Sequence, residues 1–140
     1  MFLIAAWALL ETLWWFVIVD ALLLPLAIRH PQRAWRYAAV AIAASSVGIL
    51  LHFGFTAIAP EASDTLVRSV PLLDDSEIAR ADAMLETNVL YALGQPFSGI
   101  PVKAWTLVAT SWLYLPLVLL SRAARMMLVA GIGRWASRFS

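Results

Sequence analysis

The sequence predicts an all-α integral membrane protein with two inverted re-entrant helical hairpins, each followed by a transmembrane helix. Three observations lead to this fold class. Of the 140 residues, 62% are hydrophobic and 14% are charged, with a mean hydropathy of +0.81, whereas soluble domains carry about 25% charged residues. Long apolar runs alternate with short polar segments. Four charged side chains lie inside those runs, where each needs a buried partner.

The first apolar run, residues 3–28, contains two acids, Glu11 and Asp20. Nine residues separate them, and nine steps of about 100° place two side chains on opposite sides of a straight helix. Both acids can face one buried site only if the helix breaks between them, which would make residues 3–28 a first hairpin, the interpretation that the family resemblance described below favours. An unbroken helix with one acid near an interface is the alternative, because residues 14–19 contain no Gly or Pro.

A short basic loop, residues 29–36, follows the first hairpin and carries Arg29, Arg33 and Arg36. Basic residues favour the cytoplasmic side of a membrane, so we expect this loop in the cytoplasm. Residues 37–59 then contain no acid, Lys or Arg. A helix of this length spans about 34 Å, which is enough to cross a bilayer.

Residues 60–88 have a different character, because they contain seven acids and two bases, a local charge of −5. This favours a segment outside the cytoplasm, which we assign to residues 60–81. We expect irregular backbone as far as Pro71. A helix is predicted from Asp74, because acids at that position cap helices and apolar residues then recur at helical spacing. Gly94 is a candidate for the end of that helix.

The stretch "GQPFSGIPVK", residues 94–103, holds two Pro and two Gly, which predicts a turn. Apolar sequence resumes immediately, so residues 82–112 are interpreted as a second hairpin. The last helix is predicted over residues 113–136. A hairpin followed by a spanning helix thus occurs twice within one membrane domain, residues 1–140, and the two hairpins would enter from opposite faces, as in transporters built from inverted repeats.

The last helix contains Arg122 and Arg125, three residues apart and therefore on one face. An arginine at the centre of a bilayer costs about 2.5–3.5 kcal/mol on insertion scales. Glu11 and Asp20 carry the opposite charge, and the four formal charges sum to zero. We therefore expect these two acids and two bases to pair inside the bundle.

Two segments carry a family resemblance. The first is "ETLWWFVIVDALLLPLAIRHPQRAWR", residues 11–36, and the second is "GQPFSGIPVKAWTLVATSWLYLPLVLLSRAARMMLVAGIGRW", residues 94–135. They resemble the two hairpins of the DedA family, also called the SNARE-associated or VTT-domain family, and most closely its YqaA-like branch. Together the two segments cover about half of the chain.

The resemblance implies a transporter in the cytoplasmic membrane that flips or scrambles phospholipids or polyprenyl phosphates, often coupled to protons. Glu11 and Asp20 match the family's paired acids, and Arg122 and Arg125 match its membrane arginines. The residues that match the turn of the second hairpin are Pro96, Gly99, Pro101 and Lys103.

Each charged residue has a functional and a structural interpretation. Arg122, Arg125 and Lys103 would bind a lipid phosphate, since guanidinium geometry suits bidentate contact with phosphate. The structural alternative is that the arginines only hold the bundle together by ion pairs and that Lys103 reaches the interface. Glu11 and Asp20 would carry protons or act as counter-ions of the arginines.

The sequence therefore predicts a DedA-like lipid transporter in the bacterial inner membrane, with the C-terminus cytoplasmic and residues 60–88 extracytoplasmic. The alternative function is a membrane scaffold or assembly factor that uses the buried charges for packing alone. We expect no enzyme, since no nucleophile and base are evident, and no metal, cofactor or nucleic-acid partner. Expected partners are membrane lipids and protons. Four short membrane elements bury little surface alone, which is compatible with a homodimer but does not establish the oligomeric state.

Overall fold

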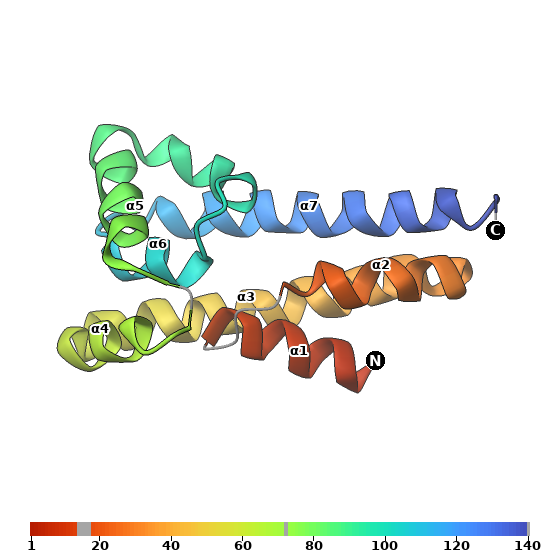
Figure 1. Cartoon of the computed structure of the whole chain (residues 1–140), viewed down its shortest axis with the longest axis horizontal. Coiled ribbons are helices and arrows are strands. Elements are labelled where there is room, and N and C mark those ends of the chain that lie inside the picture. The colour runs from red at the N-terminus through yellow and green to blue at the C-terminus, as the bar shows by residue number, and fades with distance from the viewer. Residues whose placement is uncertain (14–17, 72, 140) are drawn as a thin grey trace.

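The computed structural model describes residues 1–13, 18–71 and 73–139, and every regular element within them is helical (Figure 1). The helices, in chain order, are α1 (Phe2–Leu13), α2 (Asp20–Arg29), η1 (Pro31–Arg33), α3 (Ala34–Ile58), α4 (Pro60–Arg68), α5 (Asp75–Thr87), η2 (Val89–Phe97), α6 (Val102–Val108) and α7 (Tyr114–Ala136). The all-α prediction is confirmed.

Two long antiparallel helices, α3 and α7, run along the molecule (Figure 1). The segment Pro31–Ile58 has a mean hydropathy of 1.9 and α7 one of 1.6, so both are long and apolar enough to cross a membrane. Only 39% and 33% of their most apolar windows are buried within the molecule. Most of each window therefore lies on the outside of the molecule, which is compatible with a membrane span.

The first apolar run forms two helices that run in opposite directions, α1 and α2 (Figure 1). Helix α1 ends at Leu13 and α2 begins at Asp20, so Glu11 and Asp20 belong to different helices. The predicted separation of the two acids is confirmed, and the alternative of one straight helix is wrong. Residues 14–17, on which the predicted break falls, lie outside the described residues.

Helices α1 and α2 pack closely on the two long helices at two glycines. A Cβ added at Gly48 of α3 would lie 1.8 Å from Oγ1 of Thr12 in α1. A Cβ added at Gly133 of α7 would lie 2.6 Å from the Cβ of Ala27 in α2 and 3.1 Å from the carbonyl oxygen of Leu24. Small residues at these points let the backbones approach, as they do in membrane helix bundles.

The helix predicted from Asp74 is present as α5, and its cap is as expected: Oδ1 of Asp74 accepts hydrogen bonds from the backbone N–H groups of Ser76 and Glu77. The predicted end at Gly94 is wrong, because α5 ends at Thr87. The side chain of Asn88 accepts a hydrogen bond from the N–H of Leu90 and holds an extended backbone, which ends α5 and begins η2.

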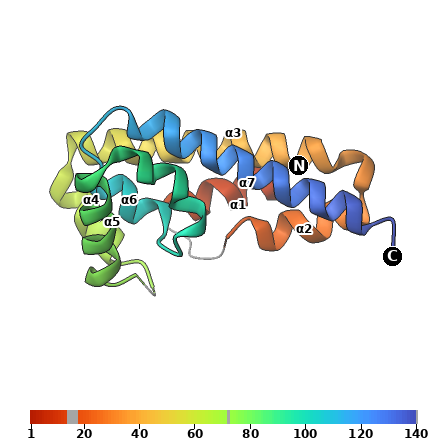
Figure 2. The same ribbon diagram turned by 90° about the horizontal axis from the view of Figure 1, so that it is seen from above.

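The turn predicted over residues 94–103 is present, but it begins later than expected. The 3-10 helix η2 continues through Gly94 and Pro96, and the chain leaves it after Phe97. Gly99 has a φ of +77°, a conformation that side-chain-bearing residues rarely adopt. The chain reverses there, and α6 runs back along η2 (Figures 1 and 2).

Helix α4 contradicts the prediction of irregular backbone before Pro71. Its first residue is Pro60, a position where the missing N–H of proline costs nothing. Ser63 and Val67 lie four residues apart and are both fully buried, while the acidic residues face outward. Ser63 also shares a 2.7 Å hydrogen bond with the hydroxyl of Thr56 in α3. These tertiary contacts stabilise a helix that composition alone did not indicate.

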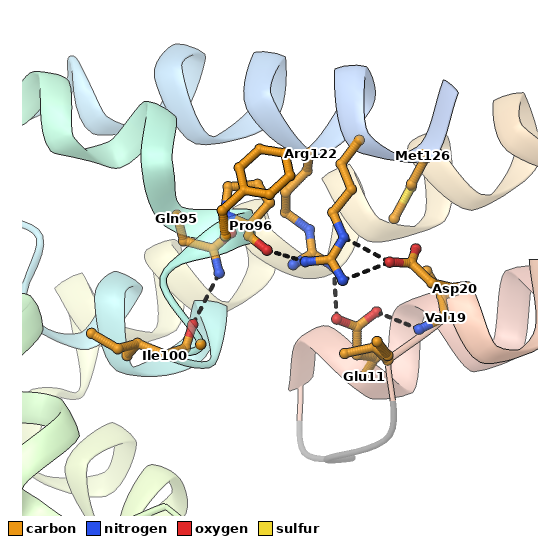
Figure 3. Close-up of a pocket in the computed structure, with 12 residues that line it drawn as sticks. Glu11, Val19, Asp20, Gln95, Pro96, Ile100, Arg122 and Met126 are labelled. Carbon is orange, nitrogen blue, oxygen red and sulfur yellow. Dashed lines mark hydrogen bonds and ion pairs between the residues drawn. The ribbon is translucent and has the colours of Figure 1, made fainter. Parts of the chain in front are cut away.

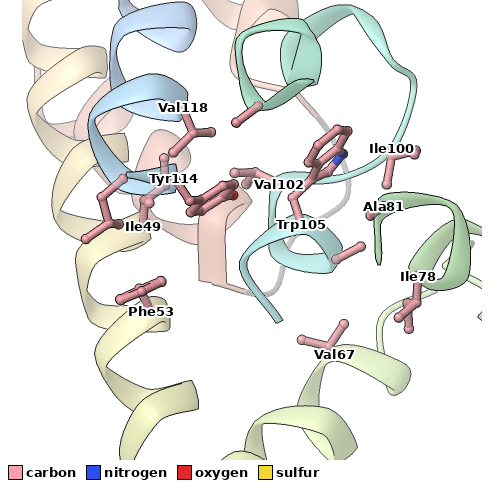
Figure 4. Close-up of a cluster of buried hydrophobic side chains, with 13 residues drawn as sticks. Ile49, Phe53, Val67, Ile78, Ala81, Ile100, Val102, Trp105, Tyr114 and Val118 are labelled. Carbon is pink, nitrogen blue, oxygen red and sulfur yellow. The ribbon is translucent and has the colours of Figure 1, made fainter. Parts of the chain in front are cut away.

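The two larger of the three hydrophobic clusters that the described residues form lie along the molecule. One surrounds Trp105 and Tyr114, both fully buried, and collects side chains from the end of α3, from α4 to α6 and from the start of α7 (Figure 4). The other surrounds Leu23 and Met126 and joins α1 and α2 to α3 and α7. The second cluster positions the first two helices, and the first positions η2 and α6.

Candidate functional site

The four charged residues of the apolar runs meet beside the middle of α7 (Figure 3). Glu11 lies in the last turn of α1, Asp20 is the first residue of α2, and Arg122 and Arg125 share one face of α7. The expected pairing is present: each acid forms an ion pair with one arginine, although more than a hundred residues separate the partners in sequence.

The first ion pair joins Glu11 and Arg122. Nη2 of Arg122 donates to Oε1 of Glu11 at 2.8 Å, and its Nε donates to the hydroxyl of Ser45 in α3 at 3.2 Å. The other carboxylate oxygen of Glu11 accepts a hydrogen bond from the N–H of Val19 at 3.2 Å. Glu11 thus joins α1, the start of α2 and α7. We call this pair the inner pair, because both side chains are buried.

The second ion pair joins Asp20 and Arg125. Nε and Nη2 of Arg125 both lie 2.6 Å from Oδ2 of Asp20. Nη1 of the same guanidinium donates to the backbone carbonyl of Pro96 at the end of η2. Arg125 therefore holds the start of α2 and the end of η2 together. We call this pair the outer pair, because its side chains are more exposed than those of Glu11 and Arg122.

Lys103, on α6, lies next to the inner pair. It is 2% exposed, and its Nζ donates to the backbone carbonyl of Glu11 at 3.3 Å. The last carbonyls of a helix have no partner within the helix and attract cations, so this lysine stabilises the end of α1. Lys103 does not line the cavity described below, and its hydrogen bond joins α6 to α1.

A cavity of about 330 Å³ opens beside the two ion pairs. All four charged side chains line it, together with residues from the start of α2, from η2 and its following turn, and from α7 (Figure 3). Ile18 and Phe97 also line it and are 47% and 73% exposed, so the cavity is open to the outside of the molecule. The site is therefore an accessible cavity with fixed charges in its wall.

The residues predicted for the second turn have different places. Pro96 and Gly99 line the cavity, and Pro96 offers its carbonyl to Arg125. Pro101 precedes α6 as its N-terminal flanking residue and does not line the cavity. The positive φ of Gly99 is the local reason why the chain can turn at the cavity rim.

The sequence did not predict the role of two buried polar residues. Gln95 was not expected in the site, and His52 was not expected to lack hydrogen-bond partners. Gln95 is 3% exposed and lines the cavity; its Nε2 donates to the carbonyl of Ile100 at 3.1 Å. His52 is 2% exposed, and neither ring nitrogen has a hydrogen-bond partner among the described residues. The only sequence signal for Gln95 was its position between Gly94 and Pro96, inside the turn that the family resemblance marks.

The site presents two guanidinium groups, whose geometry suits an anionic group, and two carboxylates that pair with them. Over residues 1–13, 18–71 and 73–139, no three His, Asp or Glu side chains gather closely enough to hold a metal ion. No protein-family model, no curated protein and no solved structure matches this chain.

Proposed function

We propose that this chain is a small transporter of the DedA type that flips or scrambles a phosphate-bearing lipid, a phospholipid or a polyprenyl phosphate, across the bacterial cytoplasmic membrane. One observation carries the proposal. Arg122 and Arg125 lie in the middle of an apolar helix and line an open cavity large enough for a small ligand group. Guanidinium groups suit bidentate phosphate contact, and charged residues within apolar helices are costly to bury and often mark a functional site.

The formal charge of the site also favours an anionic ligand. The four charges that line the cavity cancel, and Lys103, which lies next to the inner pair but outside the cavity lining, brings the local sum to three minus two, or +1. A phosphate diester carries one negative charge and would balance this sum. Glu11 and Asp20 would then serve as counter-ions of the arginines in the empty site and as proton carriers during transport.

The proposed orientation places α3 and α7 across the membrane, with the two hairpins entering from opposite faces. The supporting pattern is one of charge: exposed arginines gather near the α2–α3 connection and the C-terminus, and the acidic helices α4 and α5 lie at the opposite end (Figure 1). Basic residues favour the cytoplasm. The chain has no cysteine, so labelling of Ser137→Cys and Ser76→Cys in intact spheroplasts tests this orientation directly, and only Ser76→Cys should react.

Lipid movement in proteoliposomes tests the function. We expect wild-type protein to expose fluorescent phospholipids or polyprenyl phosphate to an outside quencher, and Arg122→Ala and Glu11→Gln to slow this at least about tenfold. The matched control is Arg134→Gln, which removes an exposed arginine from the same helix outside the cavity. If both cavity variants insert normally and move lipid as fast as wild type, the assigned roles are wrong.

The scaffold alternative is favoured by the completeness of the ion pairs, because each acid already has an arginine partner. A double charge swap separates the two functions. Glu11→Arg with Arg122→Glu keeps a pair of opposite charges but moves the guanidinium from α7 to α1. A scaffold should keep its assembly role with the swap, whereas a phosphate-binding site should lose lipid movement.

A further inference from the structure

The cavity wall contains hydrogen-bond acceptors as well as cations. Three N–H groups of Arg125 serve two acceptors, the carboxylate of Asp20 and the backbone carbonyl of Pro96. A phosphate that draws Arg125 toward itself weakens these contacts. Both acceptors would then lack donors inside a partly buried site, and leaving such groups unsatisfied is costly. A ligand that supplies only a phosphate therefore leaves part of the site unsatisfied.

Gln95 adds a third acceptor next to Pro96. Its amide orientation is fixed by chemistry, because the carbonyl of Ile100 accepts a hydrogen bond and only the NH₂ end of the side chain can donate one. Oε1 therefore remains as the free end, and it accepts no hydrogen bond from any residue that the structure describes. Gln95 is 3% exposed and belongs to the cavity wall, so a buried acceptor adjoins the place where the ligand would bind.

We infer that the site selects headgroups that carry a hydrogen-bond donor, an N–H or a hydroxyl, next to the phosphate, and that Gln95 is the residue that recognises this donor. The inference rests on the proposed lipid transport and specifies its substrate class. The phosphate faces Arg122 and Arg125, and the donor bonds to Oε1 of Gln95, next to the Pro96 carbonyl that Arg125 contacts. Sites built to bind a donor discriminate strongly against analogues that lack it.

The test is a methylation series of phospholipids with acyl-chain labels, moved by the full-length protein in proteoliposomes. The headgroups are phosphoethanolamine and its mono-, di- and trimethylated forms, each of which carries one positive charge on nitrogen and one negative charge on phosphate. The first three have at least one N–H and the trimethylated form, phosphocholine, has none. One hydrogen bond of about 1 kcal/mol corresponds to about fivefold. We expect the rate to fall at least that much in the last methylation step, and phosphoglycerol, with hydroxyl donors, to move like phosphoethanolamine.

Gln95→Met should abolish the fall in rate at the last methylation, bringing the rates for the dimethylated and trimethylated headgroups within about twofold of each other. This fall in rate is called the step below. Gln95→Glu keeps acceptor oxygens at this position and should retain the step. Leu93→Met, on the same 3-10 helix but outside the cavity wall, is the matched control and should behave like wild type. The wild-type series needs no variant, so a misfolded Gln95→Met protein would not remove the test.

Other outcomes separate the two proposals. A rate that declines evenly with each methyl group indicates selection by size and overturns the role of Gln95, as does a step that persists in Gln95→Met. Equal rates for all headgroups leave lipid transport standing and overturn only the donor requirement. If no lipid moves in the wild-type protein, the proposed function itself fails.

Discussion

The inner and outer ion pairs have the same chemistry but different surroundings. In the inner pair, the side chains of Glu11 and Arg122 are 9% and 10% exposed; in the outer pair, those of Asp20 and Arg125 are 16% and 26% exposed. The ion-pair distances are alike, 2.8 Å and 2.6 Å. Burial, and not the ion-pair distance, therefore distinguishes the two pairs.

The other hydrogen-bond partners of the two pairs also differ: those of the inner pair lie within the helix bundle, and that of the outer pair lies at the cavity rim. Arg122 and Glu11 also bond to Ser45 and to the N–H of Val19, which tie α1 and α2 to α3 and α7. Arg125 bonds instead to Pro96 at the turn that forms the cavity rim. The difference indicates that the inner pair anchors the bundle, whereas the outer pair lies on the more exposed side of the site, beside the turn at the cavity rim.

Removing one arginine from each pair should give the largest difference. Arg122→Met leaves Glu11 as a buried carboxylate without its cation, and breaking a buried pair in this way costs about 3–5 kcal/mol. Arg125→Met leaves the more exposed Asp20, so we expect a loss smaller by about 1–2 kcal/mol. Unfolding in detergent, followed by circular dichroism, measures both. Equal losses would show that burial does not distinguish the pairs.

Gly133 lies where α7 packs against α2, the helix that begins with Asp20 of the outer pair. Substituting it tests how firmly this packing holds α2 in place. Gly133→Ala would bring a Cβ within 2.6 Å of Ala27 and within 3.1 Å of a backbone oxygen, neither of which can rotate away. We expect α2 to shift and stability to fall by about 2–3 kcal/mol. Gly131→Ala on the same helix meets only the tip of Trp35 at 3.5 Å and is the control. Similar unfolding midpoints for the two variants would contradict this packing.

The glycine between α1 and α3 is the equivalent test for the inner pair. Gly48→Ala would place a Cβ 1.8 Å from the hydroxyl of Thr12, next to Glu11, and 2.9 Å from its Cβ. Turning the threonine hydroxyl would relieve the first contact but not the second, so α1 must also shift, and we expect a loss of about 1–3 kcal/mol. Gly54→Ala in the same helix has no neighbour within 4 Å. This control should be neutral or up to about 1 kcal/mol more stable, because alanine favours helix.

Much of this arrangement could be predicted from the sequence, because long apolar runs and isolated charges have few solutions in a membrane bundle. The two long helices, the separation of Glu11 from Asp20 and the pairing of both acids with Arg122 and Arg125 followed from helix geometry and charge balance, helped by the family resemblance. That these elements lie in the bacterial inner membrane and move lipid remains a prediction.

Other features depend on contacts that no local pattern encodes. Helix α4 forms because Ser63 and Val67 find buried positions against other helices. Helix α5 ends early because Asn88 bonds to a backbone N–H two residues later, which composition does not distinguish from an exposed polar residue. The place of Gln95 in the cavity wall depends on how η2 packs against α7 and on the turn before Ile100, so it became visible only in three dimensions.

The smallest expected effect on stability comes from Asp74, the exposed carboxylate that caps α5. Because water surrounds it, it provides a comparison for the two buried ion pairs. Hydrogen bonds from the hydroxyl of Ser76, and then from the N–H groups of Glu77 and Ser76, hold the pKa of Asp74 below its ordinary value of 3.8. A lowered pKa stabilises the fold above that value, and the contribution is lost as the pH falls through the folded-state pKa. Asp74→Ala should therefore lower stability slightly at neutral pH, and this difference from wild type should shrink in acid. Asp74→Asn keeps a cap without titrating, so its stability should lack this component of the pH dependence.

Because Asp74 lies far from the cavity wall in sequence and does not line it, lipid movement should be unchanged in both variants. A change in lipid movement would show that the cavity responds to α5.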